Sequence, residues 1–151
     1  MHAHRLNAYE LAPAGMNALR GVEAYLHQTT LGPQLIELVK TRASQINGCA
    51  YCLDMHSKTL RKNGESEQRI YLLSAWRESP LFTPRERAAL AWTDALTRIA
   101  ETQAPDNVFD EVHRHFDDKE VVDLTTLIGM INLWNRLAIS LRYEHPMGSA
   151  A

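Results

Sequence analysis

Apolar residues recur every three or four positions along almost the whole chain, which is the period of an α-helix. Runs of alternating apolar and polar residues, the pattern of a half-buried β-strand, are missing. Turn-forming pairs interrupt the helical pattern at Gly32-Pro33, Asn47-Gly48, Asn63-Gly64 and Ser79-Pro80. The pattern therefore predicts about seven helices, over residues 16–26, 32–47, 49–62, 66–78, 83–102, 105–116 and 117–141.

These helices predict an all-α fold, a single-domain helical bundle. The best-marked helix start is Thr83-Pro84-Arg85-Glu86, where Thr83 and Glu86 have the spacing of a capping box. Apolar residues of the last predicted helix cover more than one face, which indicates burial at the centre of the bundle or against another subunit. We expect an irregular segment over residues 1–15, one domain over 16–145 and a flexible tail over 146–151.

Composition limits the classes of partner. The chain has 151 residues, of which 45% are hydrophobic, and a net charge of −2, which gives no electrostatic reason to expect nucleic acid or an anionic membrane as partner. The longest apolar stretch includes Asn132, Asn135 and Arg136 and is a poor membrane span. Arg136 is expected to form a structural or intersubunit ion pair.

The start of the chain lacks the apolar core of a signal peptide, so we expect a cytoplasmic protein.

The two cysteines of the chain, Cys49 and Cys52, form a CxxC pair that is followed by His56. On a helix these three residues share one face, because they are three and four positions apart. Asn47-Gly48 places Cys49 near a helix start, where the helix dipole favours a thiolate, while His56 is placed to accept the proton of Cys52. A thiol pair beside an imidazole predicts redox chemistry.

Glu37 is a candidate third group for this site. It lies twelve residues before Cys49, on the preceding predicted helix. If the two helices pack as an antiparallel hairpin, its carboxylate approaches His56 and holds the imidazole in one tautomer. The alternative is an ordinary solvated surface charge.

Three simpler explanations of the cysteines stay open at this point. Cys49, Cys52, His56 and Glu37 together offer four donors, the number that zinc prefers. A static disulfide and two unreactive buried thiols are the other two. Thioredoxin-like CxxC sites normally accompany a βαβ pattern, which this sequence does not have.

The set Glu37, Cys49, Cys52 and His56 resembles the alkylhydroperoxidase D-like branch (AhpD-like) of the carboxymuconolactone decarboxylase superfamily. Both the residue types and the spacing Glu-x11-Cys-x2-Cys-x3-His match. The segment Ser44-Gln45-Ile46-Asn47-Gly48 before the first cysteine, and Ile131-Asn132-Leu133-Trp134-Asn135-Arg136 near the end, add to the resemblance. The resemblance implies an AhpD-like helical fold, with the CxxC motif at the start of a helix in a helical hairpin.

The resemblance also implies a function, a thiol-dependent peroxidase. Cys52 would be the peroxidatic cysteine, Cys49 the resolving cysteine, and His56 with Glu37 the proton relay. Tyr51 stands where the best-known member has a histidine, so it is expected to line the pocket or donate a hydrogen bond. The superfamily's decarboxylases generally lack the cysteine pair, which counts against lactone decarboxylation.

We expect no bound cofactor and no metal. The resemblance implies that the protein would use a hydroperoxide substrate and an external dithiol reductant (lipoyl, thioredoxin-like or other), and would form a homo-oligomer, a trimer or hexamer. Two rival functions use the same residues: a redox-responsive binding protein without turnover, and a zinc-stabilised helical module.

Overall fold

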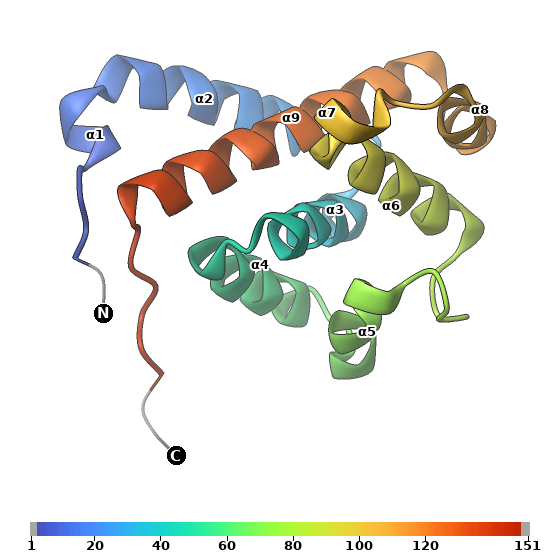
Figure 1. Cartoon of the computed structure of the whole chain (residues 1–151), viewed down its shortest axis with the longest axis horizontal. Helices are drawn as coiled ribbons and strands as arrows, with labels where there is room; N and C mark the ends of the chain where they lie inside the picture. Colours follow the sequence, from blue (N-terminus) through green and yellow to red (C-terminus); the bar gives the residue numbers. More distant parts are fainter. Residues whose placement is uncertain (1–2, 149–151) are drawn as a thin grey trace.

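Helices supply all the regular secondary structure of residues 3–148, the part of the chain that the computed structural model describes (Figure 1). They are α1 (Ala8–Leu11), α2 (Pro13–Leu26), α3 (Pro33–Asn47), α4 (Ala50–Lys62), α5 (Glu67–Leu72), the 3-10 turn η1 (Leu73–Ala75), α6 (Pro84–Thr97), α7 (Ile99–Thr102), α8 (Asp106–His115) and α9 (Asp118–Leu141). The predicted all-α class is confirmed. No helix within residues 3–148 is long and apolar enough to cross a membrane.

Nine α-helices are described in this range instead of the seven that were predicted. One of the two additional helices is α1, where an irregular segment was expected: the side chain of Asn7 accepts the backbone N–H of Tyr9 and caps a single turn. The other is α7, because the helix expected over 83–102 is interrupted at Arg98 (φ −108°, ψ 37°). Residues 146–148 are outside any helix, and the expectation of a flexible tail at 149–151 lies outside the described residues.

Helix α3 occupies the middle of the bundle, between α4, α6 and α9 (Figure 1). Every residue from 35 to 44 is buried, including the charged residues Glu37, Lys40 and Arg42. The largest apolar cluster joins α3 to α6 and α9 through side chains such as Ile36, Val39, Leu124 and Ile128. A central helix with buried charges on several sides needs polar partners from its neighbours, and these partners build the site described below.

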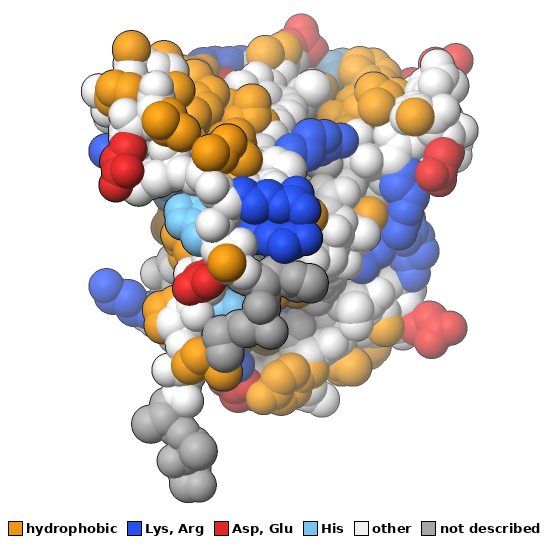
Figure 2. All heavy atoms as spheres, turned by 60° about the vertical axis from the view of Figure 1, so that its left-hand side comes forward, with side chains coloured by type: hydrophobic (Ala, Val, Ile, Leu, Met, Phe, Trp, Pro, Cys, Tyr) orange, Lys and Arg blue, Asp and Glu red, His pale blue; other side chains and the backbone are white. Residues whose placement is uncertain are grey.

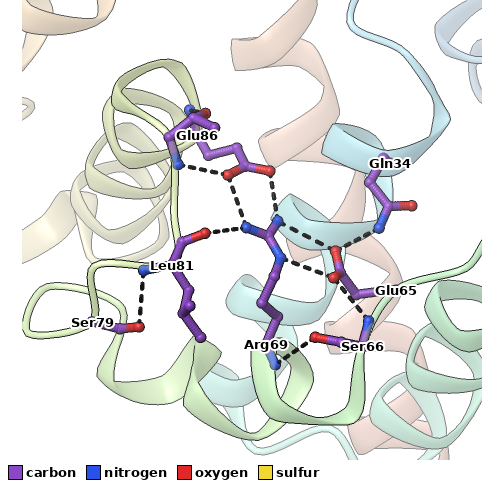
Figure 3. Close-up of polar contacts among 8 residues, drawn as sticks. Gln34, Glu65, Ser66, Arg69, Ser79, Leu81 and Glu86 are labelled. Atoms are coloured by element: carbon purple, nitrogen blue, oxygen red, sulfur yellow. Dashed lines mark hydrogen bonds and ion pairs between the residues drawn. The ribbon is translucent and has the colours of Figure 1, made fainter.

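Capping boxes begin two of the long helices. Thr83 and Glu86 form the predicted box at the start of α6, and Asp117 with Glu120 forms another at the start of α9. Glu86 also accepts a bond from Arg69 (2.6 Å), which places α5 against the start of α6 (Figure 3). Arg69 lies between Glu86 and Glu65, and Glu65 in turn accepts the amide of Gln34 on α3.

A sharp turn joins α3 to α4. Gly48 adopts the left-handed conformation (φ 69°) that favours glycine, and Cys49 follows as the N-cap residue of α4. Asn47 donates its amide to Asn132 (3.0 Å) and Asn135 (2.9 Å) on α9. The end of α3 is thus tied to α9, and the turn presents the CxxC motif at the start of α4 as the sequence predicts.

Candidate active site

Cys49 and Cys52 are joined by a disulfide at the start of α4, with their Cα atoms 5.3 Å apart. Cys49 Sγ also accepts the backbone N–H of Cys52 (3.3 Å), so it occupies the place of a capping side chain. Only 1% of Cys49 and 2% of Cys52 is exposed. The first turn of a helix leaves backbone N–H groups free, and this favours a thiolate at either position when the disulfide opens.

His56 and Glu37 form a buried pair beside the disulfide. His56 lies one turn after Cys52 on α4, and its Nδ1 is 2.8 Å from Glu37 Oε2 on α3. Glu37 is 4% and His56 7% exposed. An ionised carboxylate only accepts hydrogen bonds, so this contact keeps the proton of a neutral imidazole on Nδ1 and leaves Nε2 able to accept another. The contact that the helical hairpin predicted is therefore present.

A cavity of about 430 Å³ brings Cys52, His56, Glu37 and Tyr51 together. Apolar and aromatic side chains supply most of the remaining wall: Tyr9, Met55, Trp134, Ala138 and Tyr143. These residues come from both ends of the chain and from α4 and α9. Figure 2 turns forward the side where α9 ends, on which apolar, basic and histidine side chains lie near one another.

Charged residues of α2 and α3 form the other part of the cavity wall. Glu23 accepts a bond from Lys40 Nζ (2.6 Å) through one oxygen and from Trp134 Nε1 (2.8 Å) through the other. Lys40 is only 4% exposed, one turn beyond Glu37 on α3. Sequence reasoning missed Glu23 and Lys40, whose charge is typical of surface residues, and it named Trp134 only as part of the segment 131–136 that adds to the family resemblance.

The two cysteines line two different hollows. Cys52 lines the cavity of about 430 Å³, whereas Cys49 lines a second hollow of about 240 Å³ beside the end of α9. Tyr51, Ala138 and Tyr143 border both of them and stand between them. Tyr51 and Tyr143 meet edge to face, with ring centroids 5.5 Å apart.

The contacts within residues 3–148 bear on the expected ion pair of Arg136 and on the zinc alternative for the cysteines. Arg136 is exposed, and within residues 3–148 it bonds to the backbone and side-chain oxygens of Asn132 (2.9 and 3.2 Å) rather than to a carboxylate. The expected ion pair therefore does not form within the described chain. In that same part of the chain, no group of three or more His, Cys, Asp and Glu side chains is arranged to hold a metal. The four donors do not form the zinc site considered above.

Comparison with known proteins identifies the family. The carboxymuconolactone decarboxylase family matches residues 10–95, the segment that contains Glu37, both cysteines and His56. The chain belongs to this family. The match covers α2 to α5 and most of α6, and so includes the hairpin that carries the site.

Relatives of known sequence or structure place this family member in its AhpD-like branch. An uncharacterized Bacillus subtilis protein, YdfG, is 42% identical over 92% of this chain and 95% of its own. A crystal structure from Agrobacterium tumefaciens, of a protein of unknown function described as a candidate antioxidant defence protein AhpD, is 48% identical, with a TM-score of 0.93 over 97% of this chain and 100% of that one. An uncharacterized peroxidase-related protein from Silicibacter sp. TM1040 is 26% identical, with a TM-score of 0.80 over 91% of this chain and 73% of that one.

Proposed function

We propose that this protein is a thiol-dependent peroxidase of the alkyl hydroperoxide reductase type. The observation that carries the proposal is the shared cavity of Cys52 and the buried His56–Glu37 pair. A reactive thiol needs a base that accepts its proton, and the base needs a partner that fixes its tautomer. The spacing of Cys52 and His56 on one face of α4 and the 2.8 Å contact to Glu37 provide both parts.

The catalytic cycle begins from the dithiol. His56 accepts the proton of Cys52, and the Cys52 thiolate attacks the terminal oxygen of a hydroperoxide. An S–O bond forms, the O–O bond breaks, and the alkoxide that leaves takes the proton held by His56 to become an alcohol. The Cys49 thiol then attacks the Cys52 sulfenic acid, which releases water and forms the disulfide. An external dithiol reduces this disulfide by thiol exchange and closes the cycle.

The cavity favours an organic hydroperoxide over hydrogen peroxide. Its volume of about 430 Å³ far exceeds that of a molecule of water size, which occupies about 30 Å³ in the liquid. Its aromatic and apolar wall suits an alkyl or aryl body, while Cys52 and His56 supply the reacting groups. In this proposal, Tyr51 forms part of the wall and the proton is transferred by His56.

The second hollow suits the reductant. Cys49 borders that hollow and Cys52 the one of about 430 Å³, so in this proposal the dithiol attacks Cys49 from a different hollow than the one that binds the peroxide. Attack there releases the Cys52 thiolate directly into the cavity where the next peroxide binds. The lipoyl group and thioredoxin-like proteins are candidate donors by resemblance, and the proposal needs only that the donor is a dithiol.

Substitution of each cysteine tests the function. The wild-type protein should consume an organic hydroperoxide continuously in the presence of dithiothreitol, and one equivalent of peroxide should remove two thiols per chain reversibly. Cys52→Ser should abolish both reactions. The matched variant Cys49→Ser should still lose one thiol in a single turnover, because the Cys52 sulfenic acid forms but has no thiol to condense with.

Full turnover by Cys52→Ser would exclude the proposed role of Cys52. A redox-responsive binding protein is the second candidate, because the disulfide borders a cavity that it can reshape when it opens. Such a protein would lose two thiols to an oxidant but would not sustain peroxide consumption with excess dithiol, so steady-state kinetics distinguishes the two functions.

A further inference from the structure

The charged side chains that line the cavity of about 430 Å³ pair with one another, with one exception. Glu37 contacts His56 (2.8 Å), and Glu23 accepts a bond from Lys40 (2.6 Å). Arg20, on α2, lines the same cavity, and no carboxylate of residues 3–148 forms an ion pair with it. The wall therefore carries one positive charge that no other part of the described chain neutralises.

The carboxylate that follows Arg20 by one turn of α2 is already occupied. Both oxygens of Glu23 accept hydrogen bonds, one from Lys40 Nζ (2.6 Å) and the other from Trp134 Nε1 (2.8 Å). Glu23 also lies 3.8 Å from His27 Nε2. A bond to Arg20 would need to replace one of these contacts, so the guanidinium stays available to a ligand.

An aromatic ring holds the guanidinium of Arg20 at the cavity. Its Cζ lies 4.7 Å from the centroid of the Tyr9 ring, and Tyr9 also lines the cavity. Contact with a ring covers one face of the planar guanidinium, while its N–H groups point outward in the plane and can still donate. Both residues are exposed, so a molecule that enters from solvent meets them.

We propose that the substrate is an organic hydroperoxide that carries a carboxylate away from its peroxide group, and that Arg20 binds this carboxylate. The inference rests on the proposed peroxidase function and names its substrate class. A guanidinium matches the two oxygens of a carboxylate with two parallel N–H···O bonds. The organic body would lie along the apolar wall, with the peroxide at Cys52 and His56.

This assignment separates binding from chemistry. Arg20 stays charged throughout and transfers no proton, because its pKa lies far above neutral pH. A neutral hydroperoxide would meet only the apolar wall and the reacting groups. The difference between a carboxylated and a neutral substrate should therefore depend on Arg20.

Two peroxides of the same shape test the proposal: cumene hydroperoxide and its derivative with a carboxylate in the para position. With excess dithiothreitol, the kcat/KM of the wild type should be about 10-fold higher for the carboxylated peroxide, the effect of one hydrogen-bonded charge pair at an accessible site. Arg20→Gln should reduce this ratio to about one. Arg20→Lys should keep part of it, since the charge remains but the paired donors are lost.

Arg98→Gln is the matched control. Arg98 is exposed between α6 and α7, outside the cavity wall, so its replacement removes the same charge and should leave the preference at its full value. Loss of the preference in both variants would mean that overall charge attracts the substrate, and it would overturn the role of Arg20.

Binding of an unreactive acid provides a readout apart from turnover. 4-Isopropylbenzoate has the shape of the carboxylated substrate but no peroxide, and titration calorimetry should show about 10-fold weaker binding to Arg20→Gln than to the wild type. 4-Isopropylbenzyl alcohol, which is neutral, should bind both proteins alike. Equal binding of the acid by both proteins would refute the proposal.

The outcomes distinguish this substrate class from the function on which it rests. A wild type that reduces both peroxides without preference, or an Arg20→Gln variant that loses activity equally with both, would refute only the carboxylate site. A wild type that reduces neither peroxide would refute the peroxidase and the proposed substrate together.

Discussion

Glu37 and His56 illustrate how two buried polar side chains can satisfy each other. Each would be costly to bury alone, but the 2.8 Å contact between them offsets part of that cost. The same contact leaves the far side of the imidazole without a partner among the hydrogen bonds of residues 3–148, where it can act on Cys52. The pair is therefore both a means of burying polar groups and the proposed source of thiolate.

Replacement of His56 should reveal this role through pH. His56→Asn should lower peroxide turnover near pH 7 by about 100-fold, the typical contribution of a general base. Turnover should recover partly toward about pH 9, since a free thiol ionises by itself near pH 8.5. Stopped-flow rates across this range measure the effect, with the exposed His113→Asn as control. A loss that is the same at every pH would remove His56 as the activating base.

At the residue scale, the sequence predicted the groups that lie close together along the chain. Cys49, Cys52 and His56 occupy one short helix, so their spacing determines which face they share. Glu37 lies on another helix, and its contact depended on how the hairpin packs. Tyr143 was not among the predicted residues, because nothing in its local sequence indicates that it packs against Cys49 and Cys52, which lie far earlier in the chain.

At the scale of elements, the turn between α3 and α4 determines where the CxxC motif begins. Gly48 has a positive φ of 69°, and nothing lies within 4 Å of the position that a Cβ would occupy. The requirement for glycine at this turn is therefore conformational and not steric.

A pair of glycine substitutions should separate these two effects. Gly48→Ala should lower the free energy of unfolding by about 1–2 kcal/mol, the cost of a left-handed conformation for a residue with a Cβ. Gly21→Ala, in the interior of α2 and also without close neighbours, should instead raise it by about 0.5–1 kcal/mol. Urea unfolding of both variants provides the comparison. Two changes of the same sign would contradict this account of the turn.

Helix ends that have a capping motif in the sequence were predictable. Interruptions of a helix without such a motif were not. The capping box of Thr83 and Glu86 needs only neighbouring residues, so it formed as expected. The interruption between α6 and α7 falls at Arg98, where no glycine or proline marks it in the sequence. Similarly, the single turn of α1 depends on Asn7, whose capping role is ambiguous because the helix that it begins is only four residues long.

Across the whole molecule, a buried ionic cluster fixes the packing of α3 on α6. Asp94 accepts bonds from Arg42 Nε (2.6 Å) and Nη2 (3.1 Å), and it also pairs with Arg77. Burial alone would raise the pKa of Asp94, but its hydrogen bonds to the two arginines outweigh burial and hold the pKa below its usual value. The cluster stabilises the fold only while Asp94 is ionised.

Because of this cluster, the free energy of unfolding should decrease at acidic pH. A carboxyl group whose pKa is lowered in the folded state contributes fully above its unfolded pKa, near pH 4, and loses that contribution as the pH falls toward the folded value. Asp94→Asn should cost about 3–5 kcal/mol at neutral pH, because two arginines lose their partner. Its stability should then decrease less than that of the wild type below about pH 4.

Chemical denaturation at a series of pH values measures both effects. Asp110→Asn, on the exposed face of α8, is the control and should match the wild type at every pH. Equal acid sensitivity of Asp94→Asn and the wild type would mean that other carboxylates account for the acid dependence.

The assembled cavity shows where prediction from sequence ends. Its walls combine Tyr9, Glu23, Lys40, Trp134 and Tyr143, which come from four separate parts of the chain. Helical periodicity indicates which face of a helix is buried, but it does not state which helices meet. The charge of Glu23 and Lys40 even argues for the surface. Their contact with each other, together with the bond from Trp134 Nε1 to Glu23, accounts for the burial of Lys40 and the partial burial of Glu23.

The backbone N–H of Arg5 bonds to Leu141 O (2.9 Å), and its guanidinium bonds to Ser140 O (3.1 Å). Arg5 is thereby hydrogen-bonded to the end of α9, just before Tyr143. Proteolytic cleavage near Arg5, or an affinity tag that breaks these bonds, would loosen the cavity wall formed by Tyr9 and Tyr143 without changing either cysteine. Preparations that differ only around Arg5 are therefore expected to differ in the packing of the cavity wall.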